Sequence, residues 1–375
     1  MPLPPADPAV GALPEPRRPT RGVNVGRVRV GDGAPIAVQS MCKTDTRDVD
    51  ATLRQIRDAH SAGAEIMRVA VPDEAAARAL RRIVAQSPVP IVGDIHFNHR
   101  LALAAVDAGV AKIRINPGNI GSPEKARAVV DRAGEAGIPI RVGVNSGSLE
   151  RDLLDSSGHV TARALVESAL RHVDRLESWG FRDIVVSLKA SDVWRTIQAC
   201  RLFSAASDVP QHIGVTEAGL VLEGTAKSAA ALAVILGMGI GDTVRVSLTG
   251  DPVDEVRVAW AILSALDLRR RGPIVISCPT CGRTEINLRD LAERVADAVR
   301  DCRIPITIAV MGCVVNGPGE AREADVGICG GRGSGIVFRR GEVVRKVPES
   351  ELLDALLDEV RALEAEHGGV SQAPT

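Results

Sequence analysis

The chain has 375 residues, of which 45% are hydrophobic, so it is long enough to bury a large core and to form more than one domain. Its formal net charge is −1, only 2% of its residues are aromatic, and it contains no tyrosine. Neither a basic field nor stacking side chains favour binding to nucleic acid, and no run of about 18 apolar residues predicts a membrane span.

Residues 1–20 are rich in proline and lack the basic segment followed by an apolar one that begins a secretory signal. Their composition predicts a disordered tail. Seven cysteines are an odd number for a large chain of this kind. These features favour a reducing cytoplasm, with thiols that are free or bound to metal, over a framework of disulfides.

From about residue 36 to residue 268, within a substrate-binding domain expected at residues 21–270, the chain repeats one pattern. A short β-branched segment ending in polar residues is followed by an alanine-rich amphipathic segment. Eight such units predict an α/β fold, the (β/α)8 TIM barrel, with a doubly wound open sheet as the alternative. No GxGxxG follows the first strand, which disfavours a Rossmann-type domain. The expected strands are 36–38, 66–71, 89–92, 112–115, 138–144, 183–186, 211–215 and 242–246. The expected helices are 49–62, 73–86, 99–108, 123–136, 162–179, 193–206, 225–236 and 253–266.

Several of these helices are followed by glycine before the next strand. Left-handed glycines commonly end helices, so each of these positions is predicted to be a C-terminal cap. The glycines are Gly63, Gly109, Gly137 and Gly180.

Polar side chains stand at the C-terminal ends of the expected strands, and in a barrel these ends meet on the face that carries active sites. In chain order they are Gln39, Arg68, Asp94, His96, Arg114, Asn116, Arg141, Asn145, Lys189, His212, Glu217, Arg245 and Ser247. Five cations from separate strands would form a positive bowl, and guanidinium forks suit phosphate oxygens. The sequence therefore predicts a small anionic substrate that carries phosphate. The alternative for any single arginine is a salt bridge to a neighbouring carboxylate.

After residues 269–273 the alternation ends, and residues 271–375 are predicted to form a separate α+β domain large enough to fold alone. Its expected strands are 273–277, 304–310, 335–338 and 342–347, and its expected helices are 288–300 and 348–367. The last two strands are expected to form a hairpin that turns at Arg340 and Gly341.

Three cysteines of this domain have the spacing of an incomplete metal site. Cys278 and Cys281 form a CxxC pair, and Cys313 follows a distant strand. Three thiolates complete neither a tetrahedral zinc site nor a cluster of four irons, so a labile ligand is expected in the last position. The spacing alone leaves an iron–sulfur cluster, zinc and a dithiol switch open.

Eight strings of residues stand in order along the chain. They are VQSM (38–41), MRVAVP (67–72), DIHF (94–97), IRINPGNIG (113–121), RVGVNSGSL (141–149), HIGVTEAG (212–219), SCPTCGR (277–283) and GCVVNGPGE (312–320). Together they closely resemble the bacterial 4-hydroxy-3-methylbut-2-enyl diphosphate synthases, iron–sulfur enzymes of the non-mevalonate isoprenoid pathway. This resemblance implies a TIM barrel that binds 2-C-methyl-D-erythritol 2,4-cyclodiphosphate. It also implies a C-terminal domain, similar to a half-domain of sulfite and nitrite reductases, that carries a 4Fe–4S cluster.

The resemblance assigns the cluster ligands. It implies that Cys278, Cys281 and Cys313 bind through thiolates and that Glu320 binds through a carboxylate oxygen. A carboxylate is a hard ligand on a site otherwise held by soft sulfur, so a substrate oxygen could displace it.

The resemblance also assigns the barrel residues. It implies contacts to the diphosphate and diol from Arg68, Arg114, Arg141, Asn145, Lys189 and Ser247, and Arg245 joins this substrate-binding set through its place at a strand end. His212 and Glu217 would lie beside the reacting carbons. Glu217 would protonate the departing oxygen, with a structural salt bridge as the alternative role.

The implied reaction is a reductive ring opening. Two electrons from flavodoxin or ferredoxin pass singly through the cluster, a C–O bond breaks, and loss of water gives (E)-4-hydroxy-3-methylbut-2-enyl diphosphate. Because the linker is short, the resemblance also implies a head-to-tail homodimer in which each cluster domain caps the partner's barrel. The residues leave two rivals, a zinc-bearing barrel that binds a sugar phosphate without catalysis and an aldolase with a Schiff base on Lys189.

The remaining cysteines have plainer expected roles. Cys42 and Lys43 follow VQSM where the family usually has small polar residues. Cys42 would lie at the barrel mouth, as a harmless substitution or as an added reactive thiol. Cys200 and Cys302 are expected in cores, and Cys329 is expected in a glycine-rich tight turn.

Overall fold

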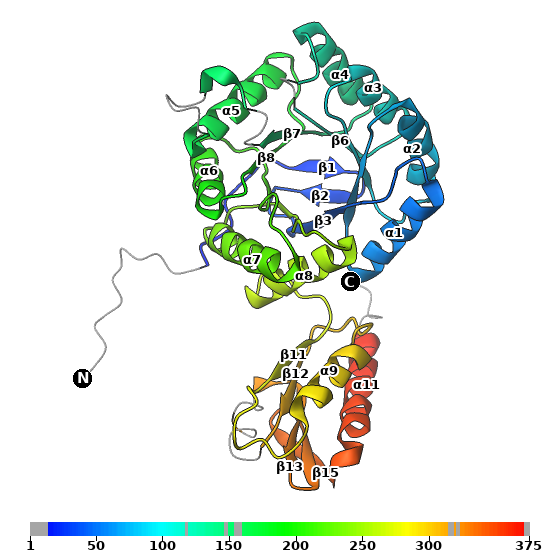
Figure 1. The fold of residues 1–375 in the computed structure, drawn as a ribbon, viewed down its shortest axis with the longest axis vertical. Helices are drawn as coiled ribbons and strands as arrows, with labels where there is room; N and C mark the ends of the chain where they lie inside the picture. Colours follow the sequence, from blue (N-terminus) through cyan, green and yellow to red (C-terminus); the bar gives the residue numbers. More distant parts are fainter. Residues whose placement is uncertain are drawn as a thin grey trace, which may run out of the picture. The chain divides into compact units, whose positions relative to one another are not determined.

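The computed structural model describes residues 14–116, 119–145, 149–153, 160–313, 319 and 323–370. The chain divides into two compact units, one that ends at Arg269 and one that begins at Arg270 (Figure 1). Most of the expected N-terminal tail, residues 1–13, lies outside the described residues. From Arg17 onwards the chain is bound to the barrel, because Arg17 and Thr20 contact the Asp242 carboxylate at 3.1 and 3.0 Å.

Eight parallel strands form the sheet of the first unit. They are β3 (Ala37–Met41), β4 (Ile66–Ala70), β5 (Ile91–Asp94), β6 (Lys112–Ile115), β7 (Ile140–Asn145), β8 (Ile184–Lys189), β9 (His212–Ile213) and β10 (Thr243–Val244). Neighbours in the chain are neighbours in the sheet from β3 to β8, and β10 pairs with both β9 and β3. A parallel bridge between Val186 and Gln211 brings β8 beside the β9 segment, so the sheet closes nearly completely. This order confirms the predicted TIM barrel and excludes the doubly wound sheet.

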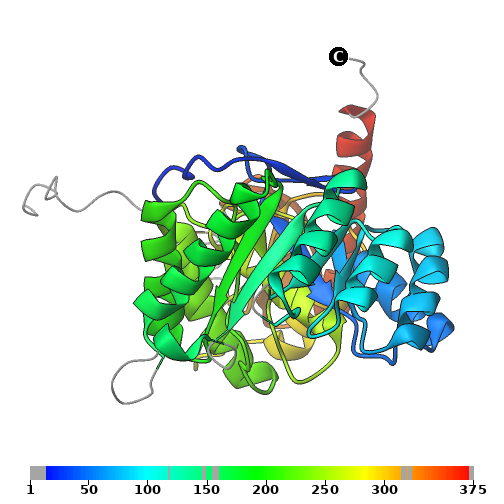
Figure 2. The ribbon, with the colours of Figure 1, turned by 90° about the horizontal axis from the view of Figure 1, so that it is seen from above.

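The expected helices are present and surround the strands (Figures 1 and 2). They are α1 (Val49–Ala62), α2 (Glu74–Gln86), α3 (His99–Asp107), α4 (Pro123–Glu135), α5 (Ala162–Ser178), α6 (Val193–Ala206), α7 (Val221–Gly237) and α8 (Pro252–Ala265), with a 3-10 turn, η2 (Arg151–Leu153), before α5. Side chains cap several N-termini; the Asp48 carboxylate, for example, accepts from the Ala51 N–H at the start of α1. Gly63, Gly109, Gly137 and Gly180 all have positive φ, as predicted for C-terminal caps.

A short hairpin that the sequence analysis missed closes the N-terminal end of the barrel. Its strands, β1 (Val23–Val25) and β2 (Val28–Val30), pair antiparallel and lie across the barrel in Figure 1. Val23, Val25 and Val30 pack against inward side chains of the barrel strands, among them Ile66 and Val185. The opposite, C-terminal end is therefore the open one.

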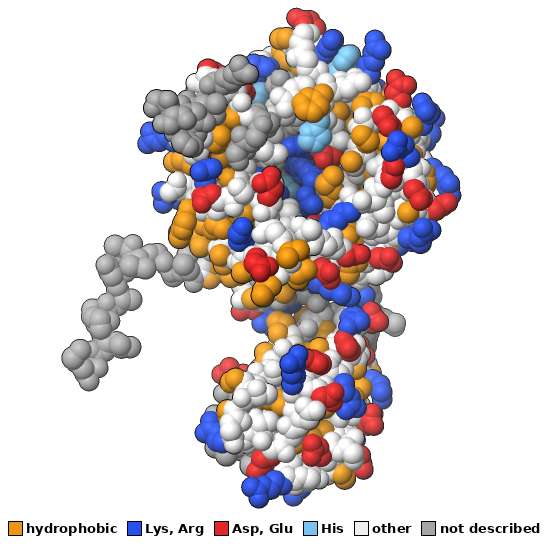
Figure 3. Space-filling model, viewed as in Figure 1, with side chains coloured by type: hydrophobic (Ala, Val, Ile, Leu, Met, Phe, Trp, Pro, Cys, Tyr) orange, Lys and Arg blue, Asp and Glu red, His pale blue; other side chains and the backbone are white. Residues whose placement is uncertain are grey.

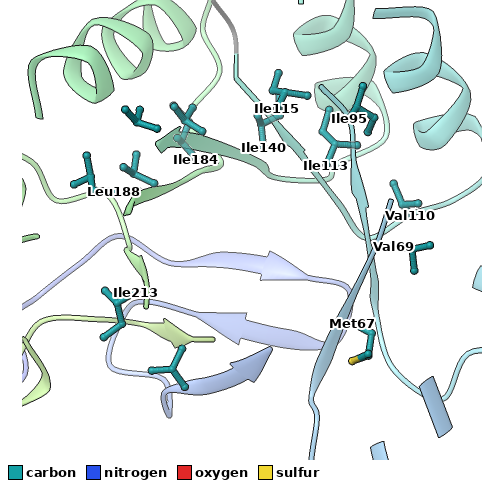
Figure 4. Close-up of a cluster of buried hydrophobic side chains, with 14 of the residues drawn as sticks. Met67, Val69, Ile95, Val110, Ile113, Ile115, Ile140, Ile184, Leu188 and Ile213 are labelled. Atoms are coloured by element: carbon teal, nitrogen blue, oxygen red, sulfur yellow. The ribbon is translucent and has the colours of Figure 1, made fainter. Parts of the chain in front are cut away.

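Alternation along the strands separates the main core from the barrel interior. Ile113 and Ile115 of β6 pack outward into the core between strands and helices (Figure 4). Since successive strand residues point to opposite faces, Lys112 and Arg114 of the same strand point inward. The same alternation in β4 and β7 turns arginine side chains toward the barrel axis, while the outward side chains bury apolar surface.

The second unit is a five-stranded mixed sheet covered on one face by two helices. Its strands lie in the order β11 (Ile274–Ser277), β12 (Thr307–Met311), β13 (Val326–Gly331), β14 (Ser334–Arg339) and β15 (Glu342–Pro348), and the first three are parallel. Its helices are α9 (Leu288–Ala298) and α11 (Leu352–Val370), with a 3-10 turn, η4 (Glu349–Glu351), before α11. Both helices share one apolar cluster with the sheet. A smaller cluster around Met311 and Cys329 lies on the other face.

Strand β13 corrects the sequence analysis, which expected a tight turn around Cys329. Cys329 is fully buried inside β13, and the turn comes later, at Arg332 and Gly333. Glycines weaken a strand prediction, but Gly327 is required here, since a Cβ on it would overlap the Phe338 ring on β14.

No described helix is long and apolar enough to cross a membrane.

Candidate active site

Cationic side chains from separate strands converge inside the open end of the barrel, as the strand-end pattern predicted. Figure 3 shows Lys and Arg side chains at the bottom of a hollow in the centre of this face. Arg114 of β6, Arg141 of β7 and Lys189 of β8 are 5%, 1% and 8% exposed. Charged side chains are seldom buried to this extent unless they are paired, so their counter-charges decide what the site can bind.

Asp94, at the end of β5, is the central carboxylate of this cluster. Its oxygens lie 3.6 Å from Arg68 Nε, 3.2 Å from Arg114 Nη1 and 3.7 Å from His96 Nε2. Burial alone would raise the pKa of Asp94, but Arg68, His96 and Arg114 together lower it below the ordinary value. Asp94 is therefore ionised at neutral pH, and part of the positive charge is balanced within the protein.

Asp94 also attracts Arg141, but none of the ion pairs among the described residues includes Arg141. No described residue accepts a hydrogen bond from its buried Nε and Nη1. Burial first, and then the charges of Arg68 and Arg114, lower the pKa of Arg141 well below its usual value. Buried N–H donors of a cation are costly when unpaired, so this position favours an anionic ligand with oxygen acceptors.

Lys112 and its partner Gln39 lie deeper in the barrel, and the sequence analysis did not assign Lys112 to the site. Lys112 Nζ lies 3.4 Å from Gln39 Oε1, and the Gln39 amide nitrogen has no described acceptor. Burial, followed by Arg141 and Arg68, lowers the pKa of Lys112 well below its usual value. The sequence could have predicted this position, because Lys112 precedes Arg114 by two residues in the same strand and therefore points to the same face.

Lys189 and His212, on neighbouring strands, contact each other directly. Lys189 Nζ lies 3.3 Å from His212 Nε2, and His212 Nδ1 lies 2.8 Å from Thr243 Oγ1 on β10. Burial first, and then the charge of Lys189, lowers the pKa of His212 well below its usual value. His212 is therefore a neutral imidazole within this cluster.

Arg245, just after β10, has the plainer role of a paired arginine. Its Nη2 lies 3.4 Å from Glu255 Oε2 of α8, and Lys43 Nζ lies 3.0 Å from Glu255 Oε1. Ser40 also donates to Glu255, at 2.7 Å. Glu255 is 1% exposed and was missed by the sequence analysis, because it lies on a helix rather than at a strand end.

Glu217 follows β9 and is exposed, with φ of 52°. The left-handed region costs a non-glycine residue about 1–3 kcal/mol, and such strain concentrates at functional sites. No described cation forms an ion pair with Glu217, which disfavours the salt-bridge alternative.

Two other expected contacts lie near these cations. Ser247 is half-buried, two residues after Arg245. Asn145, at the end of β7, accepts a hydrogen bond from Arg114 Nη2 at 3.1 Å, in the amide orientation that satisfies both of its ends.

Cys42 is part of the barrel core rather than a reactive thiol at the mouth. It is 5% exposed and packs in the main apolar cluster. Burial raises the pKa of its thiol to about 12, so the thiolate that reacts is absent at neutral pH. The harmless interpretation of this substitution is the one that fits the structure.

In the second unit the cysteines follow adjacent strands. Cys278 directly follows β11, Cys313 comes two residues after β12 and is buried, and Cys281 is exposed. The Gly312 N–H donates to Cys278 Sγ at 3.4 Å. The backbone N–H of Arg283, and then its guanidinium, lower the pKa of the Cys281 thiol. Glu320 lies outside the described residues.

These thiols fit an iron–sulfur cluster in their chemistry, since hydrogen bonds and a nearby cation favour the thiolates that ligate iron. The described part of the chain holds no group of three or more His, Cys, Asp or Glu side chains close enough together to bind a metal ion. Cys329 lies near Cys278 and Cys313, but burial, and then those two thiols, raise its pKa to about 12. The exposed and hydrogen-bonded thiols are thus the better ligands.

Asparagine in place of Asp94 is expected to lower the free energy of unfolding by about 3 kcal/mol or more, because two buried arginines lose their shared carboxylate. Urea unfolding at pH 7 measures the loss. Asp107→Asn, which removes an exposed partner of Arg132, is the control and should cost less than about 1 kcal/mol.

The pH dependence of this loss provides a second check. Since folding lowers the pKa of Asp94, its stabilising contribution is present above the pKa of an unfolded aspartate, about 3.9, and disappears as the pH falls below it. The difference in unfolding free energy between wild type and Asp94→Asn should therefore shrink below about pH 4. A difference that stayed constant down to pH 2 would contradict the assigned role of Asp94.

Comparison with known proteins finds matches over most of the chain. A family model described as the GcpE TIM-barrel domain matches residues 20–260, and one described as the GcpE protein C-terminal domain matches residues 274–362. A relative from Geobacter sulfurreducens, named 4-hydroxy-3-methylbut-2-en-1-yl diphosphate synthase (flavodoxin), is 58% identical over 92% of this chain and 98% of its own. Relatives of the same name from Desulfotalea psychrophila and Brevibacillus brevis are 54% and 52% identical. They cover 94% and 92% of this chain, and 97% and 96% of their own length is matched.

Proposed function

Because this chain belongs to the GcpE family, and its curated relatives are 4-hydroxy-3-methylbut-2-en-1-yl diphosphate synthases, we propose that it converts 2-C-methyl-D-erythritol 2,4-cyclodiphosphate to (E)-4-hydroxy-3-methylbut-2-enyl diphosphate. The chain is an oxidoreductase of isoprenoid biosynthesis. The proposed reaction opens the cyclic diphosphate with two electrons and two protons and releases one water molecule. The observation that carries the substrate assignment is that Arg141 has two buried donors, Nε and Nη1, for which no described residue is an acceptor.

The diphosphate is proposed to bind among Arg68, Arg114, Arg141 and Lys189, with Asn145, Arg245 and Ser247 around it. Burial first, and then repulsion from the neighbouring cations, lowers the pKa values of Arg141 and Lys189, and the negative charge of the diphosphate would offset that repulsion. Arg141 also offers two buried N–H donors, at Nε and Nη1, from which the oxygens of the ligand can accept hydrogen bonds. The main contribution of these cations is to orient the ring so that its reacting C–O bond is presented in one direction.

Glu217 is proposed as the acid that protonates the departing oxygen. It is exposed at the open end of the barrel and held in a strained backbone conformation in the segment between β9 and α7. Such a backbone conformation lowers stability but fixes the direction of the side chain. It therefore fits a catalytic group better than an ordinary surface carboxylate.

The cluster domain is proposed to hold a 4Fe–4S cluster through Cys278, Cys281, Cys313 and Glu320. When bound, the cluster would deliver electrons singly and offer a replaceable ligand position to a substrate oxygen. The names of the relatives include flavodoxin, so we propose flavodoxin as the electron donor, with ferredoxin as the alternative. Reduced thiols and such a cluster require a reducing compartment, so a cytoplasmic location is part of the proposal.

A head-to-tail homodimer completes the proposal. Large apolar side chains are exposed around the open end of the barrel, where they follow strands β5, β8 and β9. They are Phe97, Trp194, Leu220 and Leu222, exposed by 74%, 66%, 64% and 78%. Such a rim is typical of a surface that another protein covers, and the proposed occupant is the cluster domain of a second copy.

Glutamate in place of Leu222 is expected to shift the protein from dimer to monomer and to lower kcat with little change in the unfolding free energy, because the side chain is exposed in the single chain. Analytical ultracentrifugation measures the shift. The control is Val343→Glu, which adds the same charge to another exposed apolar position, on β15. It should leave the dimer and kcat unchanged. A fully active monomer would contradict the dimer.

The function itself is tested with anaerobically purified protein, reduced flavodoxin and the cyclodiphosphate, and ³¹P NMR follows the product. We expect brown protein with acid-labile sulfide, and conversion of the cyclic diphosphate to the linear product. Colourless protein with one zinc per chain and no turnover would overturn the proposal. Borohydride trapping of substrate on Lys189 would favour the aldolase instead.

A further inference from the structure

A chain of hydrogen bonds crosses three adjacent strands at the floor of the cationic site. It runs from Lys189 Nζ on β8 to His212 Nε2 on β9 at 3.3 Å, and from His212 Nδ1 to Thr243 Oγ1 on β10 at 2.8 Å. The three residues are 8%, 1% and 0% exposed. Thr243 lies at the first position of its strand and was not among the residues expected from the sequence.

The donors and acceptors of this chain have one consistent arrangement when the lysine is charged. A lysine ammonium carries three donors and no acceptor, so His212 Nε2 must accept its hydrogen bond. The imidazole proton then lies on Nδ1, where it is donated to the hydroxyl oxygen of Thr243. The ammonium thus sets the tautomer of His212, and the threonine hydroxyl, which can accept as well as donate, stabilises it by accepting from Nδ1–H.

The charges around His212 exclude its imidazolium form in this arrangement. Burial first, and then Lys189, Arg141 and Lys112, lower its pKa well below the usual value. An imidazolium would also place its Nε2–H against the N–H donors of the Lys189 ammonium, with no acceptor between them. His212 is thus suited to hold a neighbouring cation, and it is poorly suited to give a proton to substrate.

The backbone at Gly214, beside these hydrogen bonds, leaves room for the Lys189 ammonium. Gly214, two residues after His212, has φ of 149°, and a Cβ on it would lie 3.1 Å from Lys189 Nζ. The same Cβ would overlap the carbonyl oxygen of Arg245. Within residues 212–214, His212 therefore supplies the acceptor for the Lys189 ammonium, and Gly214 leaves the space that the ammonium occupies.

We propose that His212 and Thr243 are positioning residues: Thr243 stabilises the Nδ1–H tautomer of His212 by accepting its hydrogen bond, and His212 holds the Lys189 ammonium in the direction of a diphosphate oxygen. This proposal rests on the proposed function, since it takes the diphosphate as the group that Lys189 binds. It assigns no proton transfer to His212. Lys189 keeps two further N–H donors for the ligand after one is given to His212.

Valine in place of Thr243 keeps the shape of the side chain and removes the acceptor. The KM for the cyclodiphosphate is expected to rise on the order of tenfold, the size of one charged hydrogen bond, while kcat changes less. Serine at the same position keeps the hydroxyl and should restore the wild-type KM. A serine variant as impaired as the valine variant would contradict a role for the hydroxyl.

The tautomer is measured independently of activity by ¹⁵N NMR of imidazole-labelled, full-length oxidised protein, with His212→Gln to assign the signal. In oxidised wild type at pH 7 with the cyclodiphosphate bound, so that Lys189 is charged, we expect a neutral ring protonated on Nδ1, and in Thr243→Val a shift of population toward Nε2–H. An imidazolium, or an Nε2–H ring in wild type, would overturn this inference and leave the proposed function standing. The expected tautomer in a protein that forms no product would sink the proposed function alone.

Discussion

Serine in place of Cys281 is expected to remove the visible colour of the protein and to reduce product formation on the order of a thousandfold or more, equivalent to about 4 kcal/mol of transition-state stabilisation. Cys281 is exposed and outside both apolar clusters of its unit, so the substitution removes a ligand without opening a cavity. Iron and acid-labile sulfide per chain, together with turnover, measure the effect.

The matched control is Cys302→Ala, which removes a thiol from the core of the same unit. It should leave iron and sulfide contents unchanged and lower the free energy of unfolding by about 1 kcal/mol. Full iron and sulfide in Cys281→Ser, or their loss in Cys302→Ala, would show that the ligand set is assigned incorrectly.

Arg141→Met is expected to weaken substrate binding and at the same time to leave the protein as stable as wild type or more stable. The KM should rise on the order of 100-fold, about 3 kcal/mol, because two charge-assisted hydrogen bonds to the diphosphate are lost. The free energy of unfolding should rise by about 1 kcal/mol, because a buried cation without a described partner is replaced by an apolar side chain of similar length. Steady-state kinetics and urea unfolding without substrate measure the two effects.

Arg127→Met provides the comparison, since Arg127 is exposed on α4 and pairs only with Asp131, at 3.7 Å, among the residues described. Neither KM nor stability should change by more than about a few tenths of a kcal/mol. If Arg141→Met instead lost stability and kept its KM, Arg141 would be a structural residue rather than a substrate contact.

Local patterns were sufficient to predict the barrel. Each unit carries its own signals, such as the apolar strand around Ile113, the capping Asp48 and the terminal Gly63, and these act within a few residues of the chain. The missed elements depend on distant partners. The three-residue strands β1 and β2 are stabilised against the end of the barrel, and β13 tolerates glycine because Phe338 fills the space above Gly327.

The candidate site was predicted in part for the same reason. Their place at strand ends predicted that Arg68, Arg114 and Arg141 meet at one end of the barrel. The alternation along the strands in the structure explains why they share its inner face. The pattern could not show which cations are paired. Arg245 is balanced by Glu255 from a helix, whereas no described partner satisfies Arg141, and the difference depends on side chains far apart in the chain.

The sequence by itself determined the alternation of strands and helices, the family and the set of ionisable residues, because periodicity and short motifs are local properties. Only the tertiary structure decided the charge state and pairing of each group. Burial removes water from around Arg141 and His212. Contacts between strands pair Asp94 with two arginines and place the Thr243 hydroxyl against His212. These energies depend on distances across the barrel, which no stretch of the chain contains on its own.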